Sequence, residues 1–171
     1  MKLLKEISEK TLNISTKEIL GETYKLRKSA RGIIFNNVGE IAVQYLTNRN
    51  YHKLPGGGVE VGETCTEALE REILEEVGFN IDTPTELGAI IEYRNFEKLL
   101  HISYGYSANA TEKVTEPQLE QREIEEGQET IWVTPEKALL LMKNDTPNEK
   151  QGYFILAREI SFIEEYSKIK S

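Results

Sequence analysis

The chain reads GGVEVGETCTEALEREILEEVGF from Gly57 to Phe79, a stretch that joins a glycine-rich loop to an amphipathic helix. The segment from Leu54 to Gly58 is too rich in glycine and proline for regular structure. It predicts a loop whose backbone can approach another group closely. Thr64 and Glu67 have the spacing of a capping box at a helix N-terminus, and Gly78 is well placed to end that helix.

The predicted helix has an apolar face and a separate acidic face. The apolar stripe, with a period of four, consists of Leu69, Ile73 and Val77. The carboxylates of Glu72, Glu75 and Glu76 fall within an arc of roughly 140° or less on the other face, where like charges repel one another. A divalent cation such as Mg²⁺ satisfies that arrangement, because it prefers oxygen ligands and substrate phosphates. The alternative is a solvated acidic helix face.

The spacing of this segment resembles the box of the Nudix hydrolase family. Gly57 is followed by five residues, Glu63, seven residues and then REILEEVGF from Arg71 to Phe79. The family box is G-x5-E-x7-R-E-U-x-E-E-x-G-U, with U aliphatic or aromatic, and every fixed position is filled. With glycine near 7% of residues, a chance match in this chain is on the order of 10⁻⁵. The chain is therefore expected to hydrolyse a phosphoanhydride bond.

The resemblance implies a role for each position of the box. The expected metal ligands are Glu72, Glu75, Glu76 and the main-chain carbonyl of Gly56, with Glu75 also a catalytic candidate. The expected structural supports are Gly57, Glu63 and Arg71, of which the last two brace the loop against the helix. Phe79 is expected to serve packing. Mg²⁺ is the implied cofactor, with Mn²⁺ as a substitute.

Family members commonly add a carboxylate from a later loop, as a metal ligand or general base. The segment EGQETIW from Glu126 to Trp132 resembles the MutT branch, which places such a glutamate the same distance before a tryptophan. We therefore predict Glu126 as the general base. The competitors are Glu123, Glu125 and Glu129, and the alternative is that all four are solvated loop charges.

The resemblance implies a nucleoside diphosphate derivative as substrate. The MutT-like details favour a nucleoside triphosphate, including an oxidised purine, cut to the monophosphate and pyrophosphate. Asn148 resembles the MutT asparagine that contacts an oxidised guanine, although a helix N-cap is its alternative role. Tyr104 and Tyr106 are candidates for stacking on the base, with packing in the sheet as the alternative. Trp132 is expected to pack in the core.

Three rival functions are weighed. The first is hydrolysis of ADP-ribose or another nucleotide sugar, whose enzymes commonly carry a proline where this chain has Asn95 and Phe96. The second is isomerisation of isopentenyl diphosphate, which uses a catalytic cysteine and a modified box, whereas Cys65 lies inside an intact box. The third is a non-catalytic nucleotide sensor, which usually has a degraded box or an added DNA-binding domain.

The rest of the chain reads as strands interleaved with helices. Two strands are expected from Tyr24 to Thr47, with 33–35 and 41–43 flanking the turn Asn36–Gly39 of a hairpin, and further strands over 87–93, 99–108 and 131–133. Helices are expected over 135–142 and near the C-terminus, where the apolar face is Tyr153, Leu156, Ile160 and Ile163. This pattern predicts an α/β domain with a mixed sheet, and the resemblance implies a Nudix-type α/β/α sandwich. Residues 1–171 are expected to form one domain, with 1–20 ambiguous between helix and strand.

Composition excludes several classes of partner. A length of 171 residues suits one domain, and a net charge of −8 argues against binding of nucleic acid polymers, which depends on basic residues. The sequence shows no signal-peptide core or membrane span, and it has one cysteine. We expect a cytoplasmic monomer or homodimer that acts on a small-molecule nucleotide and has no membrane partner.

Overall fold

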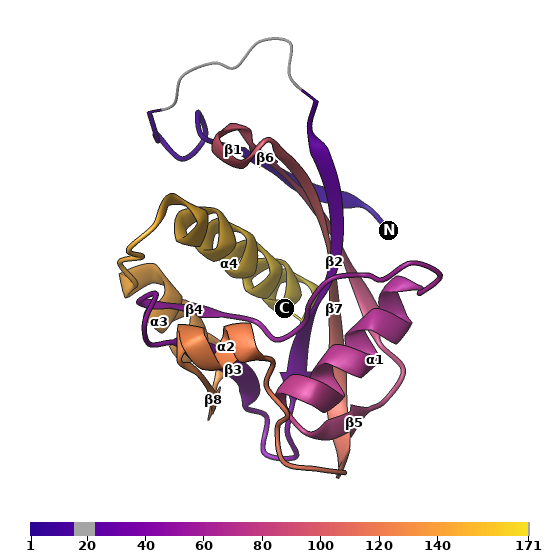
Figure 1. The fold of residues 1–171 in the computed structure, drawn as a ribbon. Helices are drawn as coiled ribbons and strands as arrows, with labels where there is room; N and C mark the ends of the chain where they lie inside the picture. The colour runs from indigo at the N-terminus through magenta and orange to yellow at the C-terminus, as the bar shows by residue number, and fades with distance from the viewer. Residues whose placement is uncertain (16–22, 171) are drawn as a thin grey trace.

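The computed structural model describes residues 1–15 and 23–170, which form an eight-stranded sheet with helices packed against it (Figure 1). The strands are β1 Leu3–Ser8, β2 Lys25–Phe35, β3 Ile41–Leu46, β4 Tyr51–Lys53, β5 Phe79–Ile81, β6 Thr85–Arg94, β7 Leu99–Lys113 and β8 Gln128–Val133. The helices are α1 Cys65–Glu76, α2 Gln121–Glu126, α3 Pro135–Asn144 and α4 Lys150–Lys170, with a 3₁₀ turn η1 at Asn95–Glu97.

The sheet is mixed. Its main path runs β1-β6-β7-β2-β3-β4, and β8 and β5 join it by pairing with β3 and β7. β1 runs parallel to β6 and β2 runs parallel to β7, whereas the other pairs are antiparallel. The β2–β7 register pairs Lys25 with Leu99 and continues to Phe35 and Asn109. The predicted α/β class with a mixed sheet is confirmed.

Helices cover both faces of the sheet, as in the predicted sandwich. Figure 1 shows α1 and α4 on opposite sides of the central strands β2 and β7. One buried cluster joins α3 and α4 to the sheet and includes Phe154 and Phe162, and the second joins α1 to it and includes Leu69 and Ile73. Each face therefore has its own hydrophobic core. No helix within 1–15 or 23–170 combines the length and apolar character needed to cross a membrane.

The main predicted elements are present. The hairpin joins β2 and β3 through the pair Phe35 and Ile41, and the Asn36 side-chain oxygen accepts hydrogen bonds from the turn backbone. α1 begins after the capping box of Thr64 and Glu67. Gly78, with φ of 83°, follows the helix in the left-handed conformation that favours glycine. These signals act within a few residues, so they predict local structure well.

The C-terminal helix buries most of the predicted face, because Leu156 and Ile163 are buried and Ile160 packs against the same cluster, but the prediction was wrong for Tyr153 and missed two buried charges. Tyr153 is 45% exposed, whereas Arg158 and Glu159 are 1% and 0% exposed. The prediction counted only apolar side chains, but an ion pair of 2.6 Å between these two charges lets them face the sheet. The ambiguous N-terminus forms β1 at 3–8, and residues 16–20 lie outside the described part of the chain. The short elements β4, β5 and α2 were not predicted.

Candidate functional site

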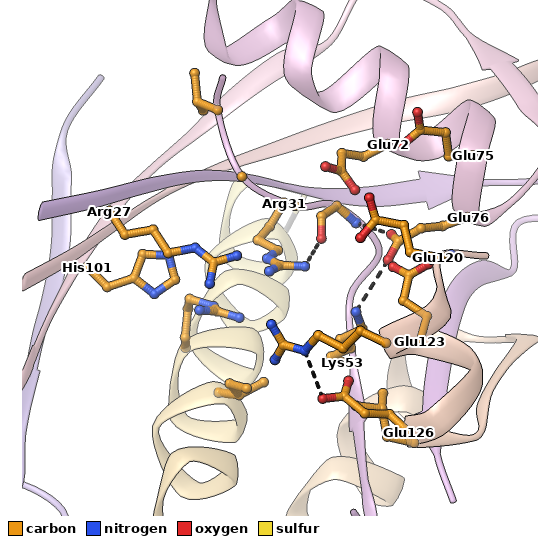
Figure 2. A pocket seen from close by; sticks show the side chains of 18 of the residues that line it. Arg27, Arg31, Lys53, Glu72, Glu75, Glu76, His101, Glu120, Glu123 and Glu126 are labelled. Atoms are coloured by element: carbon orange, nitrogen blue, oxygen red, sulfur yellow. Dashed lines mark hydrogen bonds and ion pairs between the residues drawn. The ribbon is translucent and has the colours of Figure 1, made fainter. Parts of the chain in front are cut away.

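A cavity of about 310 Å³ lies beside the glycine loop and is lined by residues of α1, α2, α4 and the strands. Its acidic lining residues are Glu60, Glu72, Glu75, Glu76, Glu120, Glu123 and Glu126. Its basic lining residues are Arg27, Arg31, Lys53, Arg71, Arg94, Arg122 and Arg158. Figure 2 shows the α1 carboxylates on one side of the cavity, with Arg27 and His101 on the other. The cavity therefore has an acidic end and a basic end.

Packing of α1 decides which carboxylates face the cavity. Its apolar residues Leu69 and Ile73 are fully buried against the sheet, so the acidic arc turns toward the glycine loop. The exposed fractions of the three side chains are 14% for Glu72, 44% for Glu75 and 2% for Glu76. The arc predicted from spacing thus becomes three unequal sites, of which Glu76 is the most enclosed.

Glu76 lies at the centre of a hydrogen-bond network. Its carboxylate accepts hydrogen bonds from the Gly56 amide at 2.6 Å, the Gln128 side chain at 3.2 Å and the Lys53 ammonium at 3.3 Å. Burial by itself would raise the pKa of Glu76, but Lys53, Arg31 and the Gly56 amide outweigh burial and lower it. Glu76 is therefore ionised at neutral pH and keeps its negative charge inside the cavity.

Gly57 leaves the space that the Glu72 carboxylate fills. A Cβ added at Gly57 would coincide with the Glu72 oxygens, so a larger residue there would displace this carboxylate. Burial raises the pKa of Glu72, Arg71 lowers it, and the neighbouring charge of Glu76 raises it further. The carboxylate oxygens of Glu72 and Glu76 suit a hard divalent cation, whose charge would offset both the cost of burying Glu72 and its repulsion by Glu76.

Gly56 meets the carboxylates through its amide. Its φ of +124° is unfavourable for other residues, and a Cβ there would clash with the Ala30 carbonyl. The Gly56 carbonyl, predicted as a metal ligand, accepts a hydrogen bond from the Arg31 guanidinium. Its role as a ligand stays a prediction, one that requires Arg31 to share this oxygen.

Arg71 links the glycine loop to the helix. Its guanidinium donates to the Gly58 carbonyl at 3.0 Å and to Glu63 at 2.9 Å. It also donates to Glu72 at 2.8 Å and to Glu75 at 3.2 Å. Hydrogen bonding to Glu63 is the main cause that raises the pKa of Arg71. Arg71 and Glu63 are thus placed to hold the loop against α1.

α2 brings two carboxylates into the cavity, and their partners differ. Glu123 forms a side-chain hydrogen bond with Glu76, and burial together with the Glu76 charge raises the pKa of Glu123 to about 7. Glu126, the predicted general base, lies 3.1 Å from the Arg122 Nε and 3.7 Å from the Arg49 guanidinium. Both line the cavity, but it is Glu123 that contacts an α1 carboxylate.

The remaining competitors lie outside the cavity. Glu125 and Glu129 are exposed and do not line it. No three acidic, histidine or cysteine side chains in the described ranges stand close enough together to hold a metal ion as they are. Arg71 and Lys53 instead provide positive charge beside Glu72 and Glu76. A metal ion would take over contacts that these two side chains make.

The basic end was not singled out from the sequence. Arg27, Ser29 and Arg31 occupy alternate positions of β2 and so share one face of the strand. This alternation can be read from the sequence and would have predicted a basic strand face. His101, opposite Arg27 in the β2–β7 register, lines the same end. Its Nε2 is 3.0 Å from the Ser29 hydroxyl, and its Nδ1 is 2.8 Å from Glu92. Burial is the main cause that lowers the pKa of His101 to about 4, so the ring is neutral at neutral pH.

Comparison with known proteins decides the family. The NUDIX domain profile matches residues 25–154, which include the glycine loop, α1, α2 and the start of α4. The chain belongs to the Nudix family. This assignment agrees with the box read from the sequence and with the carboxylates found around the glycine loop.

Two relatives carry functional names. An "8-oxo-dGTP diphosphatase" of Haemophilus influenzae is 34% identical over 116 residues, covering 64% of this chain and 76% of the relative. A "Putative 8-oxo-dGTP diphosphatase" of Bacillus subtilis is 34% identical over 101 residues, covering 57% of this chain. The match spans 58% of the length of the Bacillus relative.

Solved structures share the Nudix fold. A NUDIX hydrolase from Nitrosomonas europaea superposes with a TM-score of 0.65 at 16% identity, covering 85% of this chain and 91% of that one. A MutT protein from Methanosarcina mazei has a TM-score of 0.60 at 22% identity, covering 88% and 99%. At these identities the likeness concerns the fold.

Two of the residues predicted to bind substrate lie away from the cavity of this Nudix protein. Tyr104 and Tyr106 belong to the cluster beneath α1, on the face of β7 opposite His101, and Tyr106 is 5% exposed. They pack in the sheet, which was the alternative reading. Trp132 also packs in this cluster, with its ring 5.9 Å from that of Phe79.

Asn148 does not line the cavity either. Its amide donates to the Asn48 carbonyl at 3.3 Å, and it precedes α4 by two positions, so it is not the residue next to the helix. Gln151, three residues further along, lines the cavity from the first turn of α4. The cavity lining also includes Leu46, Tyr51 and Ile155, whose apolar surface suits packing against a nucleotide base.

Proposed function

We propose that this protein is a Nudix pyrophosphohydrolase that cuts a nucleoside triphosphate to the monophosphate and pyrophosphate with Mg²⁺ or Mn²⁺. The observation that carries this proposal is the convergence of Glu72, Glu76 and Glu123 around a glycine loop, in a cavity whose opposite end is basic. Such a cavity suits a substrate that brings a divalent cation and several phosphates together. An oxidised purine nucleotide is the proposed substrate, because two relatives are named for 8-oxo-dGTP.

The α1 carboxylates are the proposed metal site. Glu72 and Glu76 supply the enclosed oxygens, and Glu75 is placed at the more exposed edge. When bound, the metal ion supplies charge neutralisation for the phosphate oxygens and lowers the pKa of a water. Gly57 keeps the Glu72 carboxylate in place, and Arg71 keeps the loop and helix together. The chain's own part is thus to position charge before the substrate arrives.

Glu123 is the proposed general base, in preference to Glu126. Glu123 faces Glu76, and its pKa of about 7 suits a group that takes up a proton near neutral pH. Glu126 forms ion pairs with Arg122 and Arg49, so its Oε1 already contacts two guanidinium groups. Glu126 then serves to hold Arg122 at the cavity rather than to accept the proton.

A base site is proposed on the apolar side of the cavity. Tyr51 and Ile155 are 6% and 7% exposed and present apolar surface, and burial raises the pKa of Tyr51 to about 12, so its phenol stays neutral. The Gln151 amide offers one donor group and one acceptor to a purine edge. This proposal replaces Asn148, Tyr104 and Tyr106 as contacts of the base.

A hydrolysis screen tests the proposed function. Purified protein with Mg²⁺ is offered 8-oxo-dGTP, the four ordinary deoxynucleoside triphosphates, ADP-ribose and dinucleoside polyphosphates, and the products are identified. We expect pyrophosphate and monophosphate from the triphosphates, highest kcat/KM for the oxidised purine, and no turnover in excess chelator. Faster hydrolysis of ADP-ribose, or turnover that persists in chelator, would contradict the proposal.

A further inference from the structure

The basic end of the cavity holds more positive charge than its carboxylates neutralise. Arg158 pairs with Glu159 at 2.6 Å and lies 3.3 Å from Glu92. Arg94 lies 3.1 Å from the same Glu92. One carboxylate thus serves two guanidinium groups, and Glu92 also faces His101.

Arg94 also pairs with a second, more exposed carboxylate, but not every nitrogen of its guanidinium group is hydrogen-bonded. Its Nη1 lies 3.2 Å from Glu97, which is 30% exposed. Its Nε is buried without a hydrogen-bond partner, as is the Nε of Arg31. Buried donors without partners are costly. Arg31 makes hydrogen bonds to the carbonyls of Leu54 and Gly56, and no carboxylate in the part of the chain that the structure describes forms an ion pair with it.

Arg27, like Arg31, lines the cavity and forms no ion pair with a carboxylate within residues 1–15 and 23–170. Arg27 lies across from His101 in the strand register. Burial lowers the pKa of Arg27, and the charges of Arg122, Arg158 and Arg94 lower it further, so the four guanidinium groups act on the same space. Figure 2 shows Arg27 and Arg31 directed into the cavity on the side away from Glu75.

This arrangement is held by the fold before any ligand binds. Arg27 and Arg31 come from β2, Arg94 from β6 and Arg158 from α4. Ser29 and Ser103 hydrogen-bond each other at 3.0 Å, and Ser29 is also 3.0 Å from the His101 ring, which ties β2 to β7. A neutral base placed here would leave the positive charges without a partner, whereas a phosphate offers oxygens that match the fork of a guanidinium.

We propose that the arginine end, formed by Arg27, Arg94 and Arg158, is a subsite for a phosphoryl group of the substrate other than the two that flank the cleaved bond. The proposal rests on the proposed function only in placing that diphosphate at the acidic end. The phosphoryl group has two chemical sources. It is either the terminal phosphate of a nucleoside triphosphate or a phosphate ester on the ribose.

Binding of inorganic pyrophosphate to the metal-free protein in chelator tests the subsite without hydrolysis. Calorimetry compares the wild-type chain with Arg27→Gln, Arg27→Lys and the matched control Lys28→Gln, which removes one charge from the next residue of β2 and does not line the cavity. We expect Arg27→Gln to raise the Kd about tenfold or more, Arg27→Lys to raise it less, and Lys28→Gln to change it less than twofold. Equal effects of Arg27→Gln and Lys28→Gln would overturn the proposal.

Nucleotide binding under the same conditions distinguishes the two sources. The Kd is measured for ATP, for ADP and for ADP that carries a 3′-phosphate. A loss of about tenfold with Arg27→Gln that is confined to ATP assigns the terminal phosphate, and a loss confined to the 3′-phosphorylated nucleotide assigns the ester. An equal loss for all three, ADP included, would overturn the proposal, because Arg27 would then contact the common diphosphate. If no nucleotide is hydrolysed while pyrophosphate binding still depends on Arg27, the proposed function fails, and the arginine end stands as a phosphate-binding site.

Discussion

The Glu123 side chain hydrogen-bonds the Glu76 side chain, and so joins the short helix α2 to the acidic face of α1. Two carboxylates in this contact share a proton at neutral pH, because both cannot be charged without repulsion. Lys53, Arg31 and the Gly56 amide leave the negative charge on Glu76, whereas burial and the charge of Glu76 leave the proton on Glu123. A cation beside Glu76 would remove the repulsion and free Glu123 to accept a proton in turnover.

Glu123→Gln should lower kcat by about 100-fold or more with little change in melting temperature, as expected for loss of a general base. Glu126→Gln should lower kcat by less than about tenfold, and Glu125→Gln, in an exposed position of the same helix, should leave it unchanged. Steady-state kinetics with saturating Mg²⁺ measure all three. A large loss with Glu126→Gln and a small one with Glu123→Gln would return the role of base to Glu126.

Glu76→Gln should lower kcat by at least about 100-fold, because it removes a ligand charge from the metal site. Glu70→Gln is the matched control, since Glu70 is exposed on α1 and does not line the cavity. Activity is measured over a Mg²⁺ titration, with circular dichroism to verify folding. A Glu76→Gln variant that reaches the wild-type rate at saturating metal would show that this carboxylate does not hold the ion.

Gly57→Ala should weaken Mg²⁺ or Mn²⁺ binding by about tenfold while the fold is kept. The added Cβ would occupy the position of the Glu72 carboxylate, and a flexible side chain can swing away at low cost. Gly58→Ala is the control, because a Cβ there meets only the Arg27 side chain at 3.9 Å. Mn²⁺ binding is followed by electron paramagnetic resonance. Equal affinities for the two variants would contradict the packing of Glu72 against Gly57.

Asn148→Asp should leave the ratio of kcat/KM between purine and pyrimidine nucleotides unchanged, because Asn148 binds the Asn48 carbonyl and does not line the cavity. Gln151→Ala should lower that ratio by about fivefold or more, since it removes an amide that can read a purine edge. Paired assays with 8-oxo-dGTP and dCTP measure both variants. A changed ratio with Asn148→Asp alone would restore the role that the sequence predicted for it.

The free energy of unfolding should fall as the pH drops from about 6.5 to about 4, because folding keeps the buried His101 ring neutral. The folded-state pKa of about 4 is below the ordinary value of 6.5, so the unfolded chain binds the proton more readily in this range. The stability contribution is therefore complete above pH 6.5 and is lost toward pH 4. His101→Gln should flatten the melting temperature over this interval. Below pH 4.5 both proteins should still lose stability, because Glu92 has a pKa of about 2. An unchanged pH profile for His101→Gln would contradict the buried neutral ring.

The sequence by itself determined the helix α1 and the glycine loop that precedes it. The Thr64–Glu67 cap and the stripe of Leu69 and Ile73 act between residues three or four apart, and helix geometry converts such spacing directly into faces. The acidic face follows from the same short stretch, whereas the space that Gly57 leaves for Glu72 depends on how the loop folds against the helix. The helix and its acidic face were therefore accessible without knowledge of the rest of the chain.

Only the tertiary structure decided which side chains share the cavity. Glu123 meets Glu76, although they are far apart in the sequence, because α2 docks beside the sheet, where Thr47 and Asn48 donate backbone hydrogen bonds to the carbonyls at its end. Arg27, Arg94 and Arg158 converge from β2, β6 and α4 through strand register and helix docking. The sequence spacing of these residues carries no information about register or docking, which arise from packing over the whole sheet.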